Sequence, residues 1–289
     1  MITTTAPAYV RPSTLADAVR ARAEHPDWSV LAGGTDLMVG DRLASAPGVI
    51  DVFGLHELVG VEEAAAGFRI GAATPFAHLV RHAALAAAVP VLVDAARSIG
   101  AVQIAERGTI GGNVVSASPA GDMWPPLLAL DAVAELASVR GIRRVAMTAM
   151  STGYRRTECR DDELLVALMV PRPRLGTVQR WRKVGTRLAD AISVVSLAAT
   201  AQMQHDVVGR CTIALGAVAD RAIRLPEVEQ LVQGRRPDRR LAAEMTAAVA
   251  DTVRPIDDVR ATAGYRRSVA ANLVARFITD LGAGAVVPG

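Results

Sequence analysis

The stretch VLAGGTDL, residues 30–37, decides how this chain is interpreted. An apolar run ends in two adjacent glycines, and a hydroxyl and a carboxylate follow at Thr35 and Asp36. Adjacent glycines allow positive φ angles and let the backbone approach a ligand closely. Successive N–H groups in such a turn form a concave anion site, which suits a pyrophosphate because its oxygens only accept hydrogen bonds. The pattern predicts a phosphate-binding loop outside the GxGxxG class, or an ordinary strand-to-helix turn with glycine at the bend.

A second glycine pair stands further along the chain in TIGGN, residues 109–113, and Ser116, Ser118 and Asp122 follow it. Asn113 is able to donate and accept hydrogen bonds, and Ser116 to donate one. An ionised Asp122 only accepts, which suits a ribose hydroxyl and not a phosphate. The alternative is a polar, glycine-rich turn before the helix predicted at residues 124–130. Two such loops in one chain favour a dinucleotide that is held from opposite sides.

A third polar stretch, KVGTRLADAIS at residues 183–193, places Lys183, Arg187 and Asp190 between apolar runs. A cation near the N1–C2 edge of a flavin stabilises the anionic reduced ring, and an acid is suited to a place near N5. On chemistry alone, a charged hairpin turn explains the stretch equally well.

The order of apolar runs predicts an α+β chain. Strands are expected at residues 8–11, 28–31, 49–52, 68–72 and 163–170, with a hairpin over 133–146 and helical stretches over 15–22 and 75–96, broken at Pro90. The Pro171-Arg172-Pro173 segment is the expected domain boundary. After it, strands at 178–185, 192–204 and 207–218 predict an antiparallel sheet, and helices follow at 227–232, 238–253 and 264–280.

Composition excludes several classes of protein. The 289 residues are 51% hydrophobic and 21% charged, with a net charge of +3 that is spread along the chain, so a nucleic-acid binder is not expected. Cys159 and Cys211 match no metal spacing and are too few for an iron–sulfur cluster. His78 and His82 have helical spacing but no acidic third ligand beside them, so no metal site is expected. No membrane span and no signal peptide are found, which predicts a cytoplasmic protein.

Taken together, the motifs resemble the medium, FAD-binding subunit of the xanthine dehydrogenase and carbon monoxide dehydrogenase family, the molybdenum hydroxylases. The resemblance runs from about Tyr9 to about Ile278 and rests on motifs that occur in the family's order. These motifs are AGGTDLM, TIGGNVVSASPAGDMWPPLLALDA, GYRRT, ELLVALMVPRP and KVGTRLADAISVVSLAA. The resemblance implies an FAD-binding α/β domain of the vanillyl-alcohol-oxidase-like, PCMH type over residues 1–173, with subdomains of about 1–54 and 55–173. A C-terminal α+β domain with an antiparallel sheet and helices would follow over residues 174–289.

By resemblance, the pyrophosphate of FAD would lie on residues 32–37 and 109–113, and Asp122 would hold the ribitol or ribose side. Leu165 would pack near the flavin and Lys183 would reach toward it, while Arg187, Asp190 and Ile192 would border the isoalloxazine ring. The expected cofactor-binding set is Leu31, Ala32, Gly33, Gly34, Thr35, Asp36, Leu37, Thr109, Ile110, Gly111, Gly112, Asn113, Ser116, Asp122, Leu165, Lys183, Arg187, Asp190 and Ile192. No residue of this chain is expected to be catalytic.

The family resemblance also implies what the subunit does. An iron–sulfur small subunit with two 2Fe–2S clusters would deliver electrons to the flavin, which passes them to an external acceptor. A large subunit with a molybdopterin cofactor would oxidise the substrate, and the whole would form a dimer of heterotrimers. Two alternatives stay open at this point: a stand-alone FAD-dependent oxidase of the vanillyl-alcohol type, which needs its own base, and a flavin-free interaction protein that has kept the fold.

Overall fold

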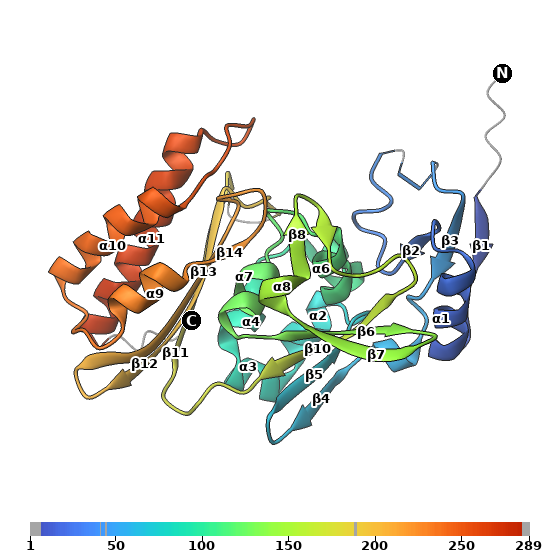
Figure 1. Ribbon diagram of the computed structural model, residues 1–289, viewed down its shortest axis with the longest axis horizontal. Helices are drawn as coiled ribbons and strands as arrows, with labels where there is room; N and C mark the ends of the chain where they lie inside the picture. The colour runs from blue at the N-terminus through green and yellow to red at the C-terminus, as the bar shows by residue number, and fades with distance from the viewer. Residues whose placement is uncertain (1–6, 41, 44, 188–189, 285–289) are drawn as a thin grey trace.

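In the computed structural model, which describes residues 7–40, 42–43, 45–187 and 190–284, three sheets follow one another along the long axis of the molecule (Figure 1). The first is a parallel sheet of order β1-β3-β2, made of β1 (Ala8–Val10), β2 (Ser29–Leu31) and β3 (Gly48–Asp51). Helix α1 (Leu15–Glu24) connects β1 to β2, and the Thr14 hydroxyl caps it by accepting a hydrogen bond from the Asp17 N–H. The glycine loop of residues 32–37 starts where β2 ends.

The central sheet is antiparallel and has the order β4-β5-β10-β6-β7. Strand β10 is apolar throughout because both of its faces are buried: Leu164 and Val166 join the core of the first sheet, whereas Leu165 and Leu168 join the central core. A bulge between Leu165 and Ala167 shifts the register of the strand. The strands are β4 (Val61–Ala64), β5 (Gly67–Gly71), β6 (Val133–Ser138), β7 (Gly141–Ala146) and β10 (Leu164–Pro171).

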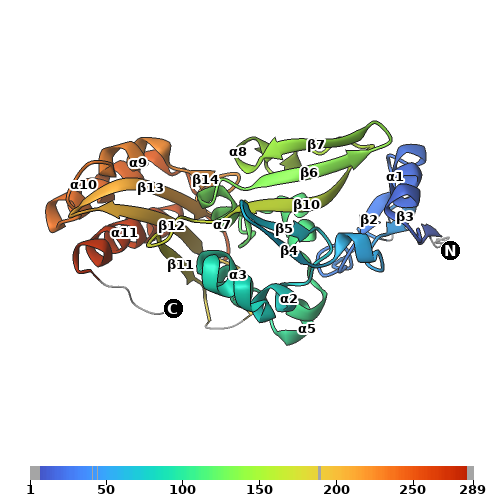
Figure 2. The same cartoon turned by 90° about the horizontal axis from the view of Figure 1, so that it is seen from below.

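Short helices cover this sheet on one side, as Figure 2 shows for α2, α3 and α5. They are α2 (Phe76–Arg81), α3 (Ala83–Ala88), α4 (Pro90–Arg97), α5 (Val102–Arg107), α6 (Ile110–Ser116) and α7 (Trp124–Ala129). The smaller elements are η1 (His56–Leu58), α8 (Met147–Met150), β8 (Ser151–Gly153) and β9 (Arg156–Thr157). The predicted helical stretch 75–96 is thus three helices with two breaks, because His82 caps α3 through its Nδ1 atom and Pro90 begins α4.

The third sheet is antiparallel and has the order β11-β12-β13-β14, with β11 (Val178–Val184), β12 (Val195–Gln204), β13 (Val207–Gly216) and β14 (Ile223–Arg224). Alternate residues of β12 belong to different cores: Leu197 and Ala199 pack with the C-terminal helices, whereas Ala198 packs in the central core. The helices are α9 (Pro226–Val232), α10 (Arg239–Thr252) and α11 (Ala263–Gly282). The predicted antiparallel sheet with helices is confirmed, and its second face packs on α4 and α7.

One predicted element is wrong. The TIGGN segment was interpreted as a glycine-rich loop, with an ordinary turn as the alternative, but residues 110–116 form helix α6. The helix starts there because the Thr109 hydroxyl caps it, accepting from the Gly112 N–H at 3.0 Å. Gly111 is needed inside the helix, since a Cβ atom at this position would lie 2.6 Å from the Ala72 carbonyl oxygen. Packing therefore overrides the low helix propensity of glycine.

Among the described residues, no helix has the length and hydropathy of a membrane span.

Candidate functional site

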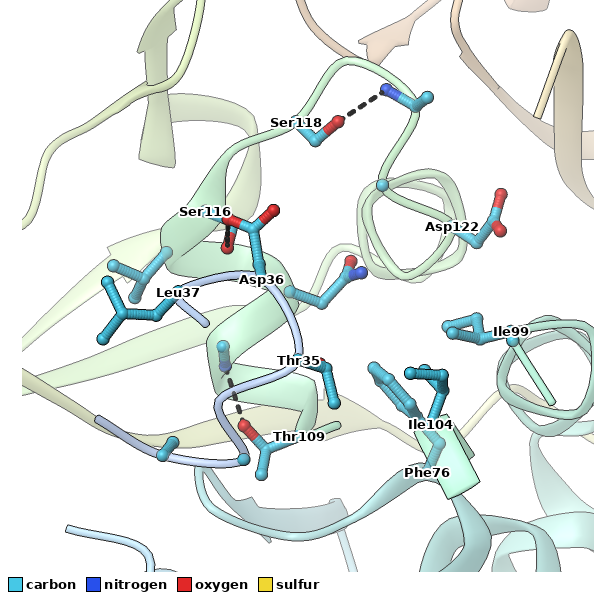
Figure 3. Close-up of a pocket in the computed structure, with 18 of the residues that line it drawn as sticks. Thr35, Asp36, Leu37, Phe76, Ile99, Ile104, Thr109, Ser116, Ser118 and Asp122 are labelled. Carbon is cyan, nitrogen blue, oxygen red and sulfur yellow. Dashed lines mark hydrogen bonds between the residues drawn. The ribbon is translucent and has the colours of Figure 1, made fainter. Parts of the chain in front are cut away.

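A cleft of about 480 Å³ opens between the glycine loop after β2, helix α6, the start of α7 and the end of β11 (Figure 3). It brings together two segments that are far apart in the sequence and were predicted to face one ligand. The predicted residues that line it are Ala32, Gly33, Gly34, Thr35, Asp36, Leu37, Thr109, Gly112, Asn113, Ser116, Asp122, Lys183, Asp190 and Ile192.

The loop of residues 32–37 has the features of an anion site. Within the described part of the chain, none of the N–H groups of Gly33, Gly34, Thr35, Asp36 and Leu37 donates a hydrogen bond to another protein group. Gly34 has a φ angle of +77°, the left-handed conformation that makes successive N–H groups converge in a nest. The loop thus offers donors without a protein acceptor, as a bound pyrophosphate would require.

The glycine loop of residues 32–37 packs against the end of α5 through Gly33. A Cβ atom at Gly33 would lie 1.8 Å from the Arg107 carbonyl oxygen, at the end of α5. This glycine therefore allows the first loop to pack against the segment that leads into α6, a role different from close approach to a phosphate. Gly112 has a different environment, because its Cβ would meet only the Thr109 hydroxyl oxygen, at 2.9 Å. Gly112 is the glycine at which a side chain would enter the cleft.

The first turn of α6 presents side chains to the cleft. Its N–H groups are already bound: Ile110 to the Thr74 carbonyl at 3.1 Å, Gly111 to the Ala72 carbonyl at 2.8 Å, and Gly112 to the Thr109 hydroxyl. Asn113 Oδ1 accepts from the Met123 N–H at 3.2 Å, which leaves its amide nitrogen as a donor.

A charged group lies beside the glycine loop. The Asp36 carboxylate is 2.5 Å from Arg42 and 3.6 Å from Arg155, and it accepts from Ser116 Oγ at 3.3 Å (Figure 3). These cations compensate the negative charge of Asp36, which would otherwise oppose a phosphate. Arg155 lines the cleft from the turn between β8 and β9. The sequence interpretation did not assign it a role, although the basic pair in GYRRT was a signal.

Buried Asp122 and Ser193 and half-buried Lys183 form a cluster at the other end of the cleft. Lys183 Nζ lies 2.6 Å from Asp122 Oδ2 and donates to the Ser98 carbonyl at 2.8 Å, and Ser193 Oγ donates to Asp122 Oδ1 at 2.5 Å. An ammonium group has three donors, so one remains for a ligand. Burial raises the pKa of the Asp122 carboxyl, although Lys183 and the Ser193 hydroxyl each favour its ionised form.

An apolar wall lies next to this cluster. Phe76, Ile99 and Ile104 gather on the side of the cleft below Asp122 (Figure 3), and exposed Ile192 lies at its rim. Phe76 and Ile104 were missed from the sequence, because their position depends on how α2 and α5 pack. The wall is suited to a flat aromatic ring.

A second cavity of about 270 Å³ adjoins the first, and Val30, Ala32, Gly112 and Val115 line both. Its floor is apolar and includes Leu165, which therefore lies in this cavity and not in the main cleft. Its polar lining includes Arg22, whose buried Nε has no hydrogen-bond partner among the described residues.

Three predicted residues, Leu31, Ile110 and Arg187, line neither cavity. Leu31 ends β2, Ile110 is buried in the packing of α6, and Arg187 is exposed and paired with Asp190 at 3.2 Å. Gly111 is buried in α6 and lines the second cavity. Residues 188–189 of the third polar stretch lie outside the described residues. Across the described ranges, no group of three or more His, Cys, Asp and Glu residues is placed to hold a metal ion.

Comparison with known proteins shows the family of the chain. Residues 3–173 match the FAD binding domain in molybdopterin dehydrogenase, and residues 180–281 match the CO dehydrogenase flavoprotein C-terminal domain. The chain is 30% identical over 279 residues to the xanthine dehydrogenase FAD-binding subunit of Escherichia coli, with 94% of each chain covered. It is 30% identical over 276 residues to the carbon monoxide dehydrogenase medium chain of Afipia carboxidovorans, covering 93% of this chain and 94% of that one.

A solved structure gives the same result. The reconstituted CO dehydrogenase from Oligotropha carboxidovorans contains a chain that superimposes with a TM-score of 0.90 at 29% identity, over 96% of this chain and 97% of that one. The two domain matches and the full-length relatives agree with the fold. The chain therefore belongs to the FAD-binding subunits of the molybdenum hydroxylase family, the family of xanthine dehydrogenase and carbon monoxide dehydrogenase.

Proposed function

We propose that FAD lies across the cleft with its pyrophosphate on residues 32–37. The observation that carries this placement is the row of unpartnered N–H groups from Gly33 to Leu37. Hydrogen bonds to a charged acceptor contribute about 1.5–3 kcal/mol each, so a nest of this kind is able to hold a pyrophosphate firmly. Asn113 and Ser116 from α6 would add side-chain donors on the opposite side, and Arg155 would add a positive charge.

The adenine half would enter the second cavity. Gly112 and Ala32 line both the cleft and the second cavity. A ligand bound to the glycine loop would therefore extend directly from the cleft into the second cavity. The cavity is apolar enough for a base, and Leu165 is part of its floor. Arg22 supplies a buried donor without a partner among the described residues, which suits an acceptor nitrogen or a ribose oxygen of the ligand.

The isoalloxazine ring would pack on Ile99 and Ile104, beside Lys183. When bound, FAD supplies a group that takes up electrons singly and releases them in pairs. Lys183 would place its remaining N–H and its positive charge next to the ring, which favours the anionic reduced form. Asp122 would hold that ammonium in place, or bind a ribityl hydroxyl, from its buried position at the start of α7.

The role that the site supports is electron transfer and not substrate oxidation. A stand-alone oxidase needs a free base beside the flavin. The acids that line the cleft are Asp36, Asp122 and Asp190, and each is paired with a cation. We propose that electrons come from the 2Fe–2S clusters of a partner small subunit, after a molybdopterin-containing large subunit has oxidised the substrate, and leave to an external acceptor.

The partner's cluster would approach at the exposed rim of the cleft. Ile192 is 65% exposed there, and Val102, between the lining residues Gly100 and Ile104, is 74% exposed. Apolar side chains at such a rim suit a protein interface. We also propose that the chain divides into two domains at Pro173, that the complex is a dimer of heterotrimers and that it is cytoplasmic.

The direct experiment is a titration of the purified chain with FAD, FMN and ADP, followed by flavin fluorescence and by competition. FAD should bind much more tightly than FMN, which lacks the adenine half, and ADP should compete with FAD. Equal affinity for FAD and FMN would contradict the use of the second cavity. No binding of either flavin would contradict the proposed site as a whole.

A further inference from the structure

Two arginines of the C-terminal region bind the backbone where β12 begins. Arg260 Nη1 donates to the Ser193 carbonyl at 3.0 Å, and Arg266 Nη1 donates to the Val194 carbonyl at 3.0 Å. Both guanidinium groups also bind one carboxylate, since Arg260 Nη2 lies 2.6 Å from Asp258 Oδ2 and Arg266 Nη2 lies 2.5 Å from Asp258 Oδ1. We refer to Asp258, Arg260 and Arg266 as the arginine clamp.

Further hydrogen bonds fix the side chains of the arginine clamp. Arg266 is 2% exposed and also donates to the Ala217 carbonyl at 3.2 Å, while Asp258 accepts from the Arg260 N–H at 2.8 Å. Buried ion pairs add little net stability, because desolvation offsets their attraction. A network of this kind is better explained by the position that it imposes on the groups it holds, here the Ser193 and Val194 carbonyls.

Ser193 connects the clamp to the cleft. Its carbonyl is bound to Arg260, and its hydroxyl donates to Asp122 Oδ1 at 2.5 Å. The other oxygen of Asp122 holds Lys183 Nζ at 2.6 Å. Ser193 is fully buried, so its hydroxyl has little freedom once its carbonyl is fixed. The chain of contacts therefore runs from Arg260 through Ser193 and Asp122 to Lys183.

We infer that Arg260 is a positioning residue for the cofactor site: by fixing the Ser193 backbone, it sets the place of Asp122 and of the Lys183 ammonium in the cleft. The inference rests on the proposed placement of the flavin beside Lys183. Functional groups must be held within about 0.5 Å of their working geometry by supporting contacts. Without Arg260, Ser193 turns away from Asp122, and the ammonium is no longer held against the ring.

The test is a double-mutant cycle of Arg260→Ala and Ser193→Ala in the FAD-loaded chain, with the midpoint potential of the flavin as the readout. Each single variant should lower the potential by about 30 mV, which corresponds to a tenfold loss of preference for the reduced flavin. The midpoint potential of the double variant should equal that of the single variant with the lower potential, because both changes break one chain of contacts. Arg254→Ala is the matched control, since Arg254 lies on the same segment and its side chain, among the described residues, binds the Asp251 and Val253 carbonyls and no part of the cleft.

Three results would overturn the inference: an Arg260→Ala potential equal to that of the wild type, additive shifts in the double variant, or an equal shift in Arg254→Ala. Additive shifts would show that Arg260 acts through its charge at a distance. If Arg260→Ala does not fold, Arg260→Lys takes its place in the cycle, because an ammonium still compensates Asp258 but lacks the fork that also reaches Ser193. If Lys183→Met lowers the potential but the clamp variants do not, only the clamp inference fails. A wild-type chain that binds no FAD refutes the proposed function itself.

Discussion

Replacing Gly112 by alanine separates the role of this glycine in the ligand site from its role in the fold. Gly112 lies in the first turn of α6 and lines both cavities. The added methyl group would meet one protein atom within 4 Å, the Thr109 hydroxyl oxygen at 2.9 Å. The methyl group would otherwise fill the passage between the two cavities, where the middle of FAD is proposed to lie.

The expected effect follows from two opposing terms. Alanine in place of glycine stabilises a helix by up to about 1 kcal/mol, which offsets the cost of moving the Thr109 side chain. An extra methyl group in a filled space costs about 1–3 kcal/mol, and here that cost falls on the complex with FAD. We therefore expect a near-normal melting temperature for the free chain and about a 5- to 150-fold weaker Kd for FAD.

Fluorescence titration with FAD measures this Kd, and thermal unfolding of the free chain measures stability. Gly264→Ala is the matched control, because Gly264 also lies in the first turn of a helix, with no atom within 4 Å of the added Cβ. The control should bind FAD like the wild type. A Gly112→Ala chain that is folded and binds FAD with unchanged affinity would refute the proposed path of the cofactor past α6.

Three further perturbations test other contacts of the site. Gly33→Ala puts a methyl group 1.8 Å from the Arg107 carbonyl oxygen, so the melting temperature of the free chain should fall by several degrees; unchanged melting contradicts the close packing of the glycine loop against the end of α5. Lys183→Met removes the cation beside the flavin, so spectroelectrochemical titration should give a lower potential; an equal potential removes Lys183 from the flavin's surroundings. Although burial opposes the shift, Arg260 and Arg266 lower the pKa of the Asp258 carboxyl below its ordinary value of 3.8. Its stabilising contribution is present above that value and is lost as the pH falls through the folded-state pKa, so the unfolding free energy should fall more steeply with acid in the wild type than in Asp258→Asn.

Local patterns were sufficient to predict most of the fold. The strands that became β6, β7 and β10 to β13 are long apolar or alternating runs between turn residues, and their period is visible without tertiary information. Helix α6 was not predicted, because two glycines disfavour a helix locally. Its formation depends on Thr109 as a cap and on contact with Ala72, and the second of these comes from a distant part of the chain.

The site residues also divide into those that local motifs predict and those that depend on tertiary packing. The glycine loop and Lys183 were predicted from motifs, and the structure places them in one cleft. Arg155, Phe76 and Ile104 were not predicted as site residues. A side chain in a hairpin turn or on a short helix reaches the cleft only through the packing of distant elements. The separate role of Gly33 was also hidden, because a sequence does not show that Arg107 lies against it.

Stopped-flow reduction of the FAD-loaded chain tests the central claim most directly. The isolated chain is mixed with the organic substrates of molybdenum hydroxylases, first alone and then with the proposed iron–sulfur and molybdenum partner chains, and flavin absorbance is followed. The electron-transfer account predicts no rapid bleaching by the chain alone and rapid bleaching once both partners are present. Rapid bleaching of the flavin by an organic substrate with this chain alone would contradict it and would identify a stand-alone oxidase.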